Sequence, residues 1–240
     1  MEVINFSSEE ELKKFVTENF LTFLGEGSEG FVIETKNHDA VKIFGYYNTI
    51  EDFEIDKTGR DYKQTEIITT EDIQIKDILF PEKLIIINDQ IYGYVTKAIK
   101  NIKIGKTIEE DYEYIKRMNY NKFIKAYYEI FQKIITLSNY GIEVFDLAEN
   151  LIYDGNKFII IDTLGYKKKI NPSKAKTRNL ASLNRAIETI FNIYGIIFYL
   201  EDDLNIINCN NSIEIYIAKI REAIEASLEN QYIKKKGVYY

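Results

Sequence analysis

The chain has 240 residues, of which 45% are hydrophobic, and a formal net charge of -7 at pH 7, which suits one large globular domain or two smaller lobes. Its acidic balance argues against non-specific binding to nucleic acid or to an anionic membrane, because both attract basic surfaces. Cys209 is the only cysteine, so the sequence excludes an internal disulfide and a cysteine-rich zinc site.

The N-terminal segment MEVINFSSEEELKKF is acidic where a signal peptide would be basic and then apolar. It predicts a short helix, in which Ser7 or Ser8 accepts from exposed amide groups and Glu10 or Glu11 completes a capping box. The most apolar tract, Ile190–Leu200, is too short for a membrane span and long enough for a buried helix. We therefore expect a cytoplasmic protein without a membrane span, and secretion by a route that needs no signal peptide stays open.

Three glycines follow the G-x-G-x-x-G pattern, at Gly25, Gly27 and Gly30. In a dinucleotide-binding fold such glycines would open a helix. Here Phe31–Thr35 has the β-branched and aromatic residues of a strand, and a second strand, Ala40–Phe44, follows a polar turn. The glycines are therefore predicted to lie in a hairpin, whose backbone amides can approach phosphates closely. Lys42 on the next strand would direct a positive charge at the same phosphates.

The rest of the chain is predicted to hold two more strand pairs and two helical regions. In chain order they are the strands of Phe80–Asn101 around an Asn88-Asp89 turn, an amphipathic helix within Phe123–Ile142, a hairpin of Leu151–Tyr153 and Lys157–Ile161 around Asp154-Gly155, and a helical region from near Thr177 to Leu228. The second hairpin would bring the two acids that flank it, Asp146 and Asp162, to one end, where they could share a cation.

The glycine loop GEGSEGFV and the strand AVKIF resemble the protein-kinase-like family, whose A-x-K motif matches Ala40 and Lys42. Two later segments, DLAEN and IIIDT, are similar to the catalytic loop and the metal-binding motif of that family and follow in the same order. The resemblance implies a bilobal α+β fold. Its N-lobe, residues 1–98, would be an antiparallel sheet with the short N-terminal helix, and its C-lobe, residues 99–240, would be mainly helical and reduced.

The resemblance also implies catalytic and metal-binding roles. Asp146 would accept the proton of an attacking hydroxyl, and Asn150 and Asp162 would bind magnesium. The residues implied to hold the phosphates of ATP are Gly25, Gly27, Ser28, Gly30 and Lys42. The cofactors expected from these roles are ATP and Mg2+.

Two further roles follow from the same family pattern. Thr96 would lie near the residue that limits the depth of the adenine pocket, and the backbone at Ala98 would face the base. Glu66 is the expected ion-pair partner of Lys42, and Glu54 and Glu71 remain alternatives.

The sequence departs from the family pattern at several positions. Asn150 is the fourth residue after Asp146, whereas the family motif places the asparagine fifth. Val144 stands where the family has a histidine, and the glycine after Asp162 comes one place late, at Gly165. No A-P-E motif follows, so control by a long activation segment is not expected.

The resemblance implies a phosphotransferase of the serine/threonine kinase type, which would move the γ-phosphoryl group of ATP to a hydroxyl on a protein. The shortened catalytic loop leaves open a pseudokinase that binds nucleotide or acts as a scaffold. A kinase of small molecules is a further alternative. The basic run Tyr166–Arg178 is interpreted as a solvated charged face, with attraction of an acidic or phosphorylated partner as the alternative.

Overall fold

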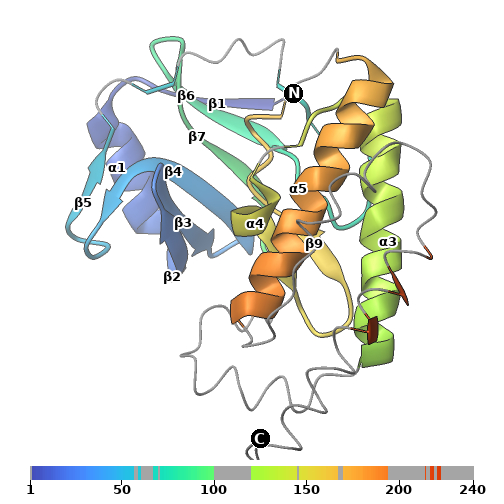
Figure 1. The fold of residues 1–240 in the computed structure, drawn as a ribbon. Coiled ribbons are helices and arrows are strands. Elements are labelled where there is room, and N and C mark those ends of the chain that lie inside the picture. Colours follow the sequence, from blue (N-terminus) through green and yellow to red (C-terminus); the bar gives the residue numbers. More distant parts are fainter. Residues whose placement is uncertain are drawn as a thin grey trace, which may run out of the picture. The chain divides into compact units, whose positions relative to one another are not determined.

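The structure, a computed structural model, describes residues 2–56, 59–60, 67–69, 71–99, 120–144, 146–166 and 170–193, with residues 214, 217–218 and 221–222. These residues form an α+β fold with a mainly antiparallel sheet and a few helices (Figure 1), which agrees with the predicted α+β class. The chain divides into two compact units: the first comprises Met1–Ile102 and Asp162–Gly165, and the second comprises Lys103–Ile161 and Tyr166–Tyr240. Each unit contains buried hydrophobic residues of its own.

The first unit is built on a sheet whose described part has seven strands. Its elements in chain order are β1 (Glu2–Phe6), α1 (Glu9–Asn19), β2 (Phe20–Gly27), β3 (Gly30–Thr35), β4 (Asp39–Tyr47), β5 (Phe53–Ile55), β6 (Lys83–Ile87) and β7 (Gln90–Lys97). The strand order is β1-β6-β7-β4-β3-β2, with β5 paired to β4. β1 runs parallel to β6, and the other pairs are antiparallel.

The sheet buries side chains on both of its faces. One face packs against α1 through a hydrophobic cluster that includes Leu12 and Val16 of the helix (Figure 1). The opposite face holds a second cluster, in which Leu164 packs with Tyr94. Lys42 is paired directly with Tyr94 across β4 and β7, and directly paired residues project to the same face of a sheet. Lys42 therefore lies on the face opposite α1.

The N-terminal segment was predicted to contain a short helix capped at Ser7 or Ser8, and no strand was predicted for Glu2–Phe6 ahead of that cap. These residues form β1, which pairs with β6, because the run Val-Ile-Asn-Phe has the β-branched and aromatic side chains that suit a sheet. The predicted cap is confirmed in one of its two registers. Ser8 is the N-cap and its hydroxyl accepts from the Glu11 amide at 3.3 Å, while the Glu11 carboxylate accepts from the Ser7 amide at 2.7 Å.

Both predicted strand pairs of the first unit are confirmed, since β3 pairs with β4 and β6 pairs with β7. β2 and β3 meet at a Gly27–Gly30 pair, so the glycines lie in a hairpin and do not open a helix. Asn88 and Asp89 form the turn between β6 and β7, with φ angles of 48° and 64°. Positive φ at both central residues gives a turn whose twist matches that of the flanking strands.

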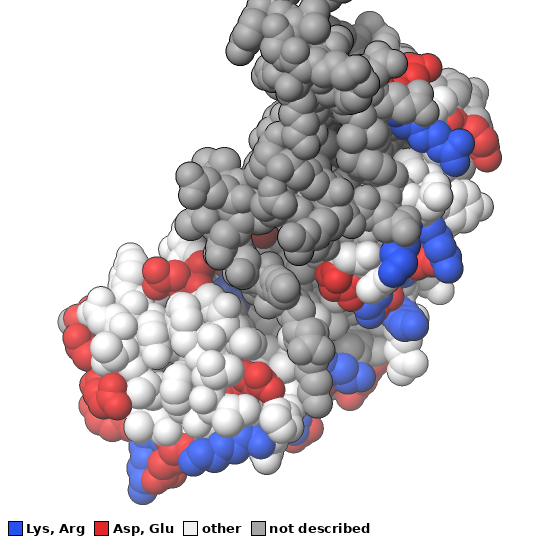
Figure 2. Space-filling view, turned by 90° about the horizontal axis from the view of Figure 1, so that it is seen from below, with Lys and Arg blue, Asp and Glu red and all other residues white. Residues whose placement is uncertain are grey.

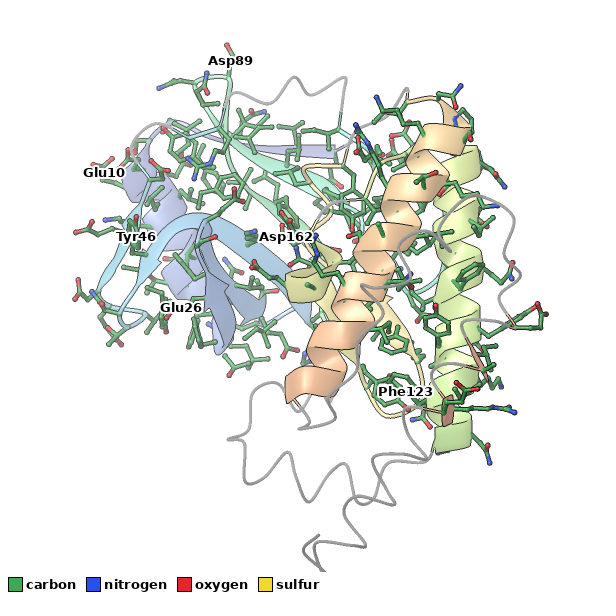
Figure 3. All side chains as sticks on the ribbon, viewed as in Figure 1. Glu10, Glu26, Tyr46, Asp89, Phe123 and Asp162 are labelled. Carbon is green, nitrogen blue, oxygen red and sulfur yellow. The ribbon has the colours of Figure 1, made fainter. Side chains whose placement is uncertain are left out.

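The second unit contains two long helices and a short hairpin. Its described elements in chain order are α3 (Tyr120–Asn139), α4 (Leu147–Asn150), β8 (Leu151–Tyr153), β9 (Phe158–Ile160) and α5 (Pro172–Ile193). α3 and α5 lie side by side (Figure 1). α3 also packs against the hairpin through Phe123 (Figure 3), whose ring centroid is 5.3 Å from that of Tyr153 and 5.4 Å from that of Phe158. The predicted amphipathic helix and the predicted hairpin are therefore confirmed.

α5 begins at Pro172, so the predicted start near Thr177 is wrong. The Asn171 side chain accepts from the Ser173 amide at 3.0 Å, and proline at the first helical position needs no amide partner. The later part of the predicted helical region lies outside the described residues, apart from the helical residues 214, 217–218 and 221–222. In the described part of the chain, no helix is long and apolar enough to cross a membrane.

Candidate functional site

The hairpin of β2 and β3 contains glycines of two kinds. A Cβ atom at Gly30 would lie 2.1 Å from the carbonyl oxygen of Ile43 on β4, so strand packing alone requires glycine there. A Cβ atom at Gly25 or Gly27 would meet nothing within 4 Å, and neither residue has a positive φ. The packing of the described chain therefore explains Gly30 and leaves open space at Gly25 and Gly27. Ser28 lies at the tip between the two strands.

Lys42 lies on β4, the strand next to this hairpin, and pairs with Val32 of β3. It is 8% exposed, and a buried charge requires a partner to offset its lost hydration. Its ammonium donates to the Asp162 Oδ2 atom. A second carboxylate oxygen, Oε2 of Glu29 at the hairpin tip, lies 3.9 Å from the Lys42 Nζ atom.

Asp162 (Figure 3) belongs to a short segment, Asp162–Gly165, that packs within the first unit. Its φ is 54°, in the left-handed region that aspartate tolerates better than most residues. The next two residues anchor the segment. The Thr163 hydroxyl donates to the carbonyl of Leu79 at 2.9 Å, and Leu164 is buried in the hydrophobic cluster on the sheet face opposite α1. The backbone therefore holds the Asp162 carboxylate against the sheet at Lys42.

The second oxygen of this carboxylate has a partner that the sequence interpretation missed. The Tyr94 hydroxyl donates to the Asp162 Oδ1 atom at 2.8 Å. Strand periodicity could have indicated Tyr94, because it precedes the expected pocket residue Thr96 by two positions and therefore shares its face of β7. Glu29 was also missed, although it lies inside the glycine pattern itself.

Thr96, Ala98 and a glutamate partner of Lys42 are the other residues of the first unit that were expected to belong to the nucleotide site. Thr96 is half-buried and paired with Ala40 on β4, and its hydroxyl donates to the carbonyl of Phe80 at 3.1 Å. Ala98 follows β7 directly and is half-buried. Glu66, the expected partner of Lys42, lies outside the described residues, so that pairing stays a prediction. Glu54 is exposed on β5.

Asp146 and Asn150 lie at the two ends of α4 in the second unit. Asp146 is the exposed N-cap residue, has a φ of 48°, and makes no side-chain capping bond. The carbonyl of Asn150 accepts from the Ile161 amide at 3.0 Å, which places Asn150 at the open end of the β8–β9 hairpin. Asp162 is the next residue after Ile161 in the chain.

The segment before Asp146 is held by Asn179 of α5, another residue that the sequence interpretation missed. Asn179 is 0% exposed. Its Oδ1 atom accepts from the Val144 amide at 2.8 Å, and its amide nitrogen donates to the Ile142 carbonyl at 2.8 Å and to the Ser138 hydroxyl at 3.0 Å. Because these partners come from α3 and the loop after it, no local pattern in the sequence could have indicated them.

The described residues contain no group of three or more His, Cys, Asp or Glu side chains that could hold a metal ion. The two expected magnesium ligands, Asp162 and Asn150, belong to the first and the second unit respectively, and the magnesium site stays a prediction.

Several carboxyl and phenol groups of the first unit have shifted pKa values. Hydrogen bonds from the Ser7 amide and hydroxyl lower the pKa of Glu11, and a hydrogen bond from Ser8 lowers the pKa of Glu10. Burial raises the pKa of Tyr47, with a smaller contribution from Glu51. On the face seen in Figure 2, the basic and acidic side chains of the described residues are interspersed.

Comparisons with known proteins give no family assignment. No protein-family model matches the chain, and no curated protein matches it. The likeness to the protein-kinase-like family therefore stays an interpretation of the sequence motifs, and the function has to be argued from the residues themselves.

Proposed function

We propose that the chain is an ATP- and magnesium-dependent phosphotransferase of the protein-kinase-like class, with a bilobal fold, which transfers the γ-phosphoryl group to a hydroxyl of a protein. One observation carries this proposal: the buried Lys42 is paired with Asp162 on the sheet face, next to a glycine hairpin with open space at two of its glycines. Lys42 and Asp162 are distant in sequence, so the fold has to bring them together.

The chemistry of this pair suits a metal-bound phosphate. A lysine ammonium can donate to phosphate oxygens, and a carboxylate can bind the magnesium that neutralises charge on the phosphates. In the kinase class the glycine loop joins the first two strands of the sheet and the lysine lies on the third. Lys42 is on β4, the third strand of the meander β2-β3-β4 that contains the hairpin.

The role of Asp146 in this proposal is that of a base. The acceptor hydroxyl oxygen would form a bond to the γ-phosphorus, and the bond from that phosphorus to the bridging oxygen would break to release ADP. The hydroxyl proton would pass to the Asp146 carboxylate, which is exposed and makes no capping bond. The open space at Gly25 and Gly27 would let backbone amides approach the phosphates.

A second candidate is a pseudokinase that binds nucleotide without transferring phosphate. It is favoured by α4, because the Asn150 amide donates to the Asp146 carbonyl at 3.2 Å and the shortened interval is a single helical turn. Such a turn leaves fewer ways to orient the two side chains than the longer loop of the family would.

The two candidates are separated by transfer of label from γ-labelled ATP in the presence of magnesium. Wild type, Asp146→Asn and Asp162→Asn would be compared, with a cell lysate and a set of small-molecule acceptors as substrates. Label on a protein in the wild type alone supports the proposal, and label on a small molecule would replace its acceptor. Binding of ATP without any labelled product would support the pseudokinase.

A further inference from the structure

The Asp162 carboxylate receives hydrogen bonds on both of its oxygens. Lys42 donates to Oδ2, and the Tyr94 hydroxyl donates to Oδ1 at 2.8 Å. Lys42 and Tyr94 face each other directly across β4 and β7, so the two donors come from neighbouring positions of one sheet. Tyr94 is 3% exposed, and its ring is held in the cluster that also contains Leu164.

Lys42 and Tyr94 differ in whether their hydrogen bonds to Asp162 can persist when a nucleotide binds. If Lys42 donates to nucleotide phosphates, its bond to Oδ2 is weakened or lost. Tyr94 carries no charge and its ring is fixed by packing, so its bond to Oδ1 can remain. A carboxylate oxygen accepts at two lone pairs, and a hydrogen bond from tyrosine therefore leaves each oxygen able to bind a cation.

We propose that Tyr94 is a positioning residue, which orients the Asp162 carboxylate so that it can bind the magnesium that accompanies the nucleotide. This inference rests on the proposed function. Residues that hydrogen-bond to a metal ligand fix its orientation, and their loss commonly weakens metal binding by about tenfold or more. Tyr94 meets that description for Asp162, whereas the family pattern in the sequence assigns it no role.

The first test is a calorimetric titration of ATP into wild type and Tyr94→Phe, once with magnesium and once with EDTA. Tyr94→Phe keeps the buried ring and removes only the hydroxyl. We expect the affinity for ATP with magnesium to fall by about tenfold and the affinity for ATP in EDTA to stay unchanged. An equal loss under both conditions, or no loss under either, would overturn the proposal.

Tyr92→Phe is the matched control. Tyr92 lies on the same strand but belongs to the cluster on the other face of the sheet. Its loss of a hydroxyl should leave the magnesium-dependent part of ATP affinity at the wild-type value. A similar loss in Tyr92→Phe would mean that any hydroxyl removed from β7 disturbs the site, and the specific role of Tyr94 would be overturned.

A second measurement separates this inference from the proposed function. The melting temperatures of Tyr94→Phe, Asp162→Gly and the double variant are compared without nucleotide, and glycine is used because it keeps the positive φ of this position. Tyr94→Phe should lower the melting temperature of the wild type and have little effect in Asp162→Gly, because the bond is already lost. Equal shifts of the melting temperature in both backgrounds would show that Tyr94 and Asp162 are not hydrogen-bonded and would overturn the proposal. If the two residues are coupled but the wild type binds no ATP, the proposed function fails and the bond is merely structural.

Discussion

Asp162 and Asp146 are both aspartates with a left-handed backbone conformation, but their side chains have different hydrogen bonding. In the first unit, both carboxylate oxygens of Asp162 accept hydrogen bonds, from Lys42 and from Tyr94. In the second unit, Asp146 is exposed and makes no side-chain capping bond. Strained backbone conformations persist only where the surrounding structure holds them, and they often occur at functional sites. Under the proposed function, the fixed carboxylate would hold a cation and the exposed one would take a proton.

The glycine hairpin shows the same division between residues that packing explains and residues that it does not. Gly30 is required by the close approach of β4, whereas Gly25 and Gly27 have open space around them. A sequence motif treats all three glycines alike. The structure separates the glycine that strand packing requires from two glycines that the packing of the described residues does not explain.

The largest expected effect is the loss of phosphoryl transfer when Asp146, the exposed aspartate of the comparison, is replaced. Asp146→Asn removes the proton acceptor but keeps a residue that tolerates a positive φ, so phosphoryl transfer should fall by about a thousandfold. The free energy of unfolding should change by less than about 0.5 kcal/mol. Transfer is measured with labelled ATP and stability by urea denaturation. Unchanged transfer in this variant would remove Asp146 from the mechanism.

The next effect concerns the glycines. Gly30→Ala should lower the free energy of unfolding by about 3 kcal/mol, because the added methyl group overlaps the Ile43 carbonyl. Gly25→Ala, the matched variant, should leave stability near that of the wild type and weaken ATP binding. Urea denaturation and calorimetric titration of both variants check this prediction. Equal destabilisation by the two changes would show that the hairpin distinction is wrong.

A smaller effect is expected on the side of Asp162. Asp162→Asn leaves the buried Lys42 without its charged partner, and removing one member of a buried ion pair is destabilising. We expect a loss of about 2 kcal/mol in the free energy of unfolding, below the usual range for buried pairs because the Asp162 side chain is 30% exposed. Lys42→Met in the same background should restore part of this loss. If Asp162→Asn is as stable as wild type, the pair is not holding the segment in place.

The smallest expected effect is on the pH dependence of stability, and it concerns Glu11, a carboxylate away from both Asp146 and Asp162. It provides a baseline for acid titrations of the other variants. Hydrogen bonds from Ser7 hold the pKa of Glu11 below its ordinary value of 4.5. A lowered pKa contributes stability that is present above the ordinary value and is lost as the pH falls through the folded-state value. Glu11→Gln should therefore flatten the acid side of the stability profile slightly. An unchanged profile below pH 4.5 would mean that the cap bond is absent in solution.

Local patterns in the sequence predicted much of the described fold. The glycine hairpin, the Asn88-Asp89 turn and the β8–β9 hairpin depend on neighbouring residues, and turn chemistry identifies them correctly. β1 was missed because its five residues precede a strong helix cap, and its partner β6 is distant in the chain. The start of α5 was missed because it is set by an asparagine cap followed by proline, whereas the prediction rested on the spacing of the apolar residues further along the helix.

The sequence also predicted some of the residues of the candidate site, because they belong to recognisable local motifs. Motif spacing identified Lys42 and Asp162, and the structure brings their side chains together. Tyr94 and Asn179 were missed because their roles depend on partners from other elements. A hydrogen bond from β7 to a segment after β9 leaves no periodic signal in the sequence. Such residues become visible only when the strands are paired in space.

The central claim is that Lys42 and Asp162 form a site for the phosphates of a magnesium-bound nucleotide. The most direct measurement is a calorimetric titration of ATP, with and without magnesium, into wild type and Lys42→Met. Methionine keeps the apolar stem of the side chain and removes its charge. The account predicts magnesium-enhanced binding to the wild type and a loss of about tenfold or more in Lys42→Met. A wild type that binds no ATP, or equal binding by the two proteins, would contradict it.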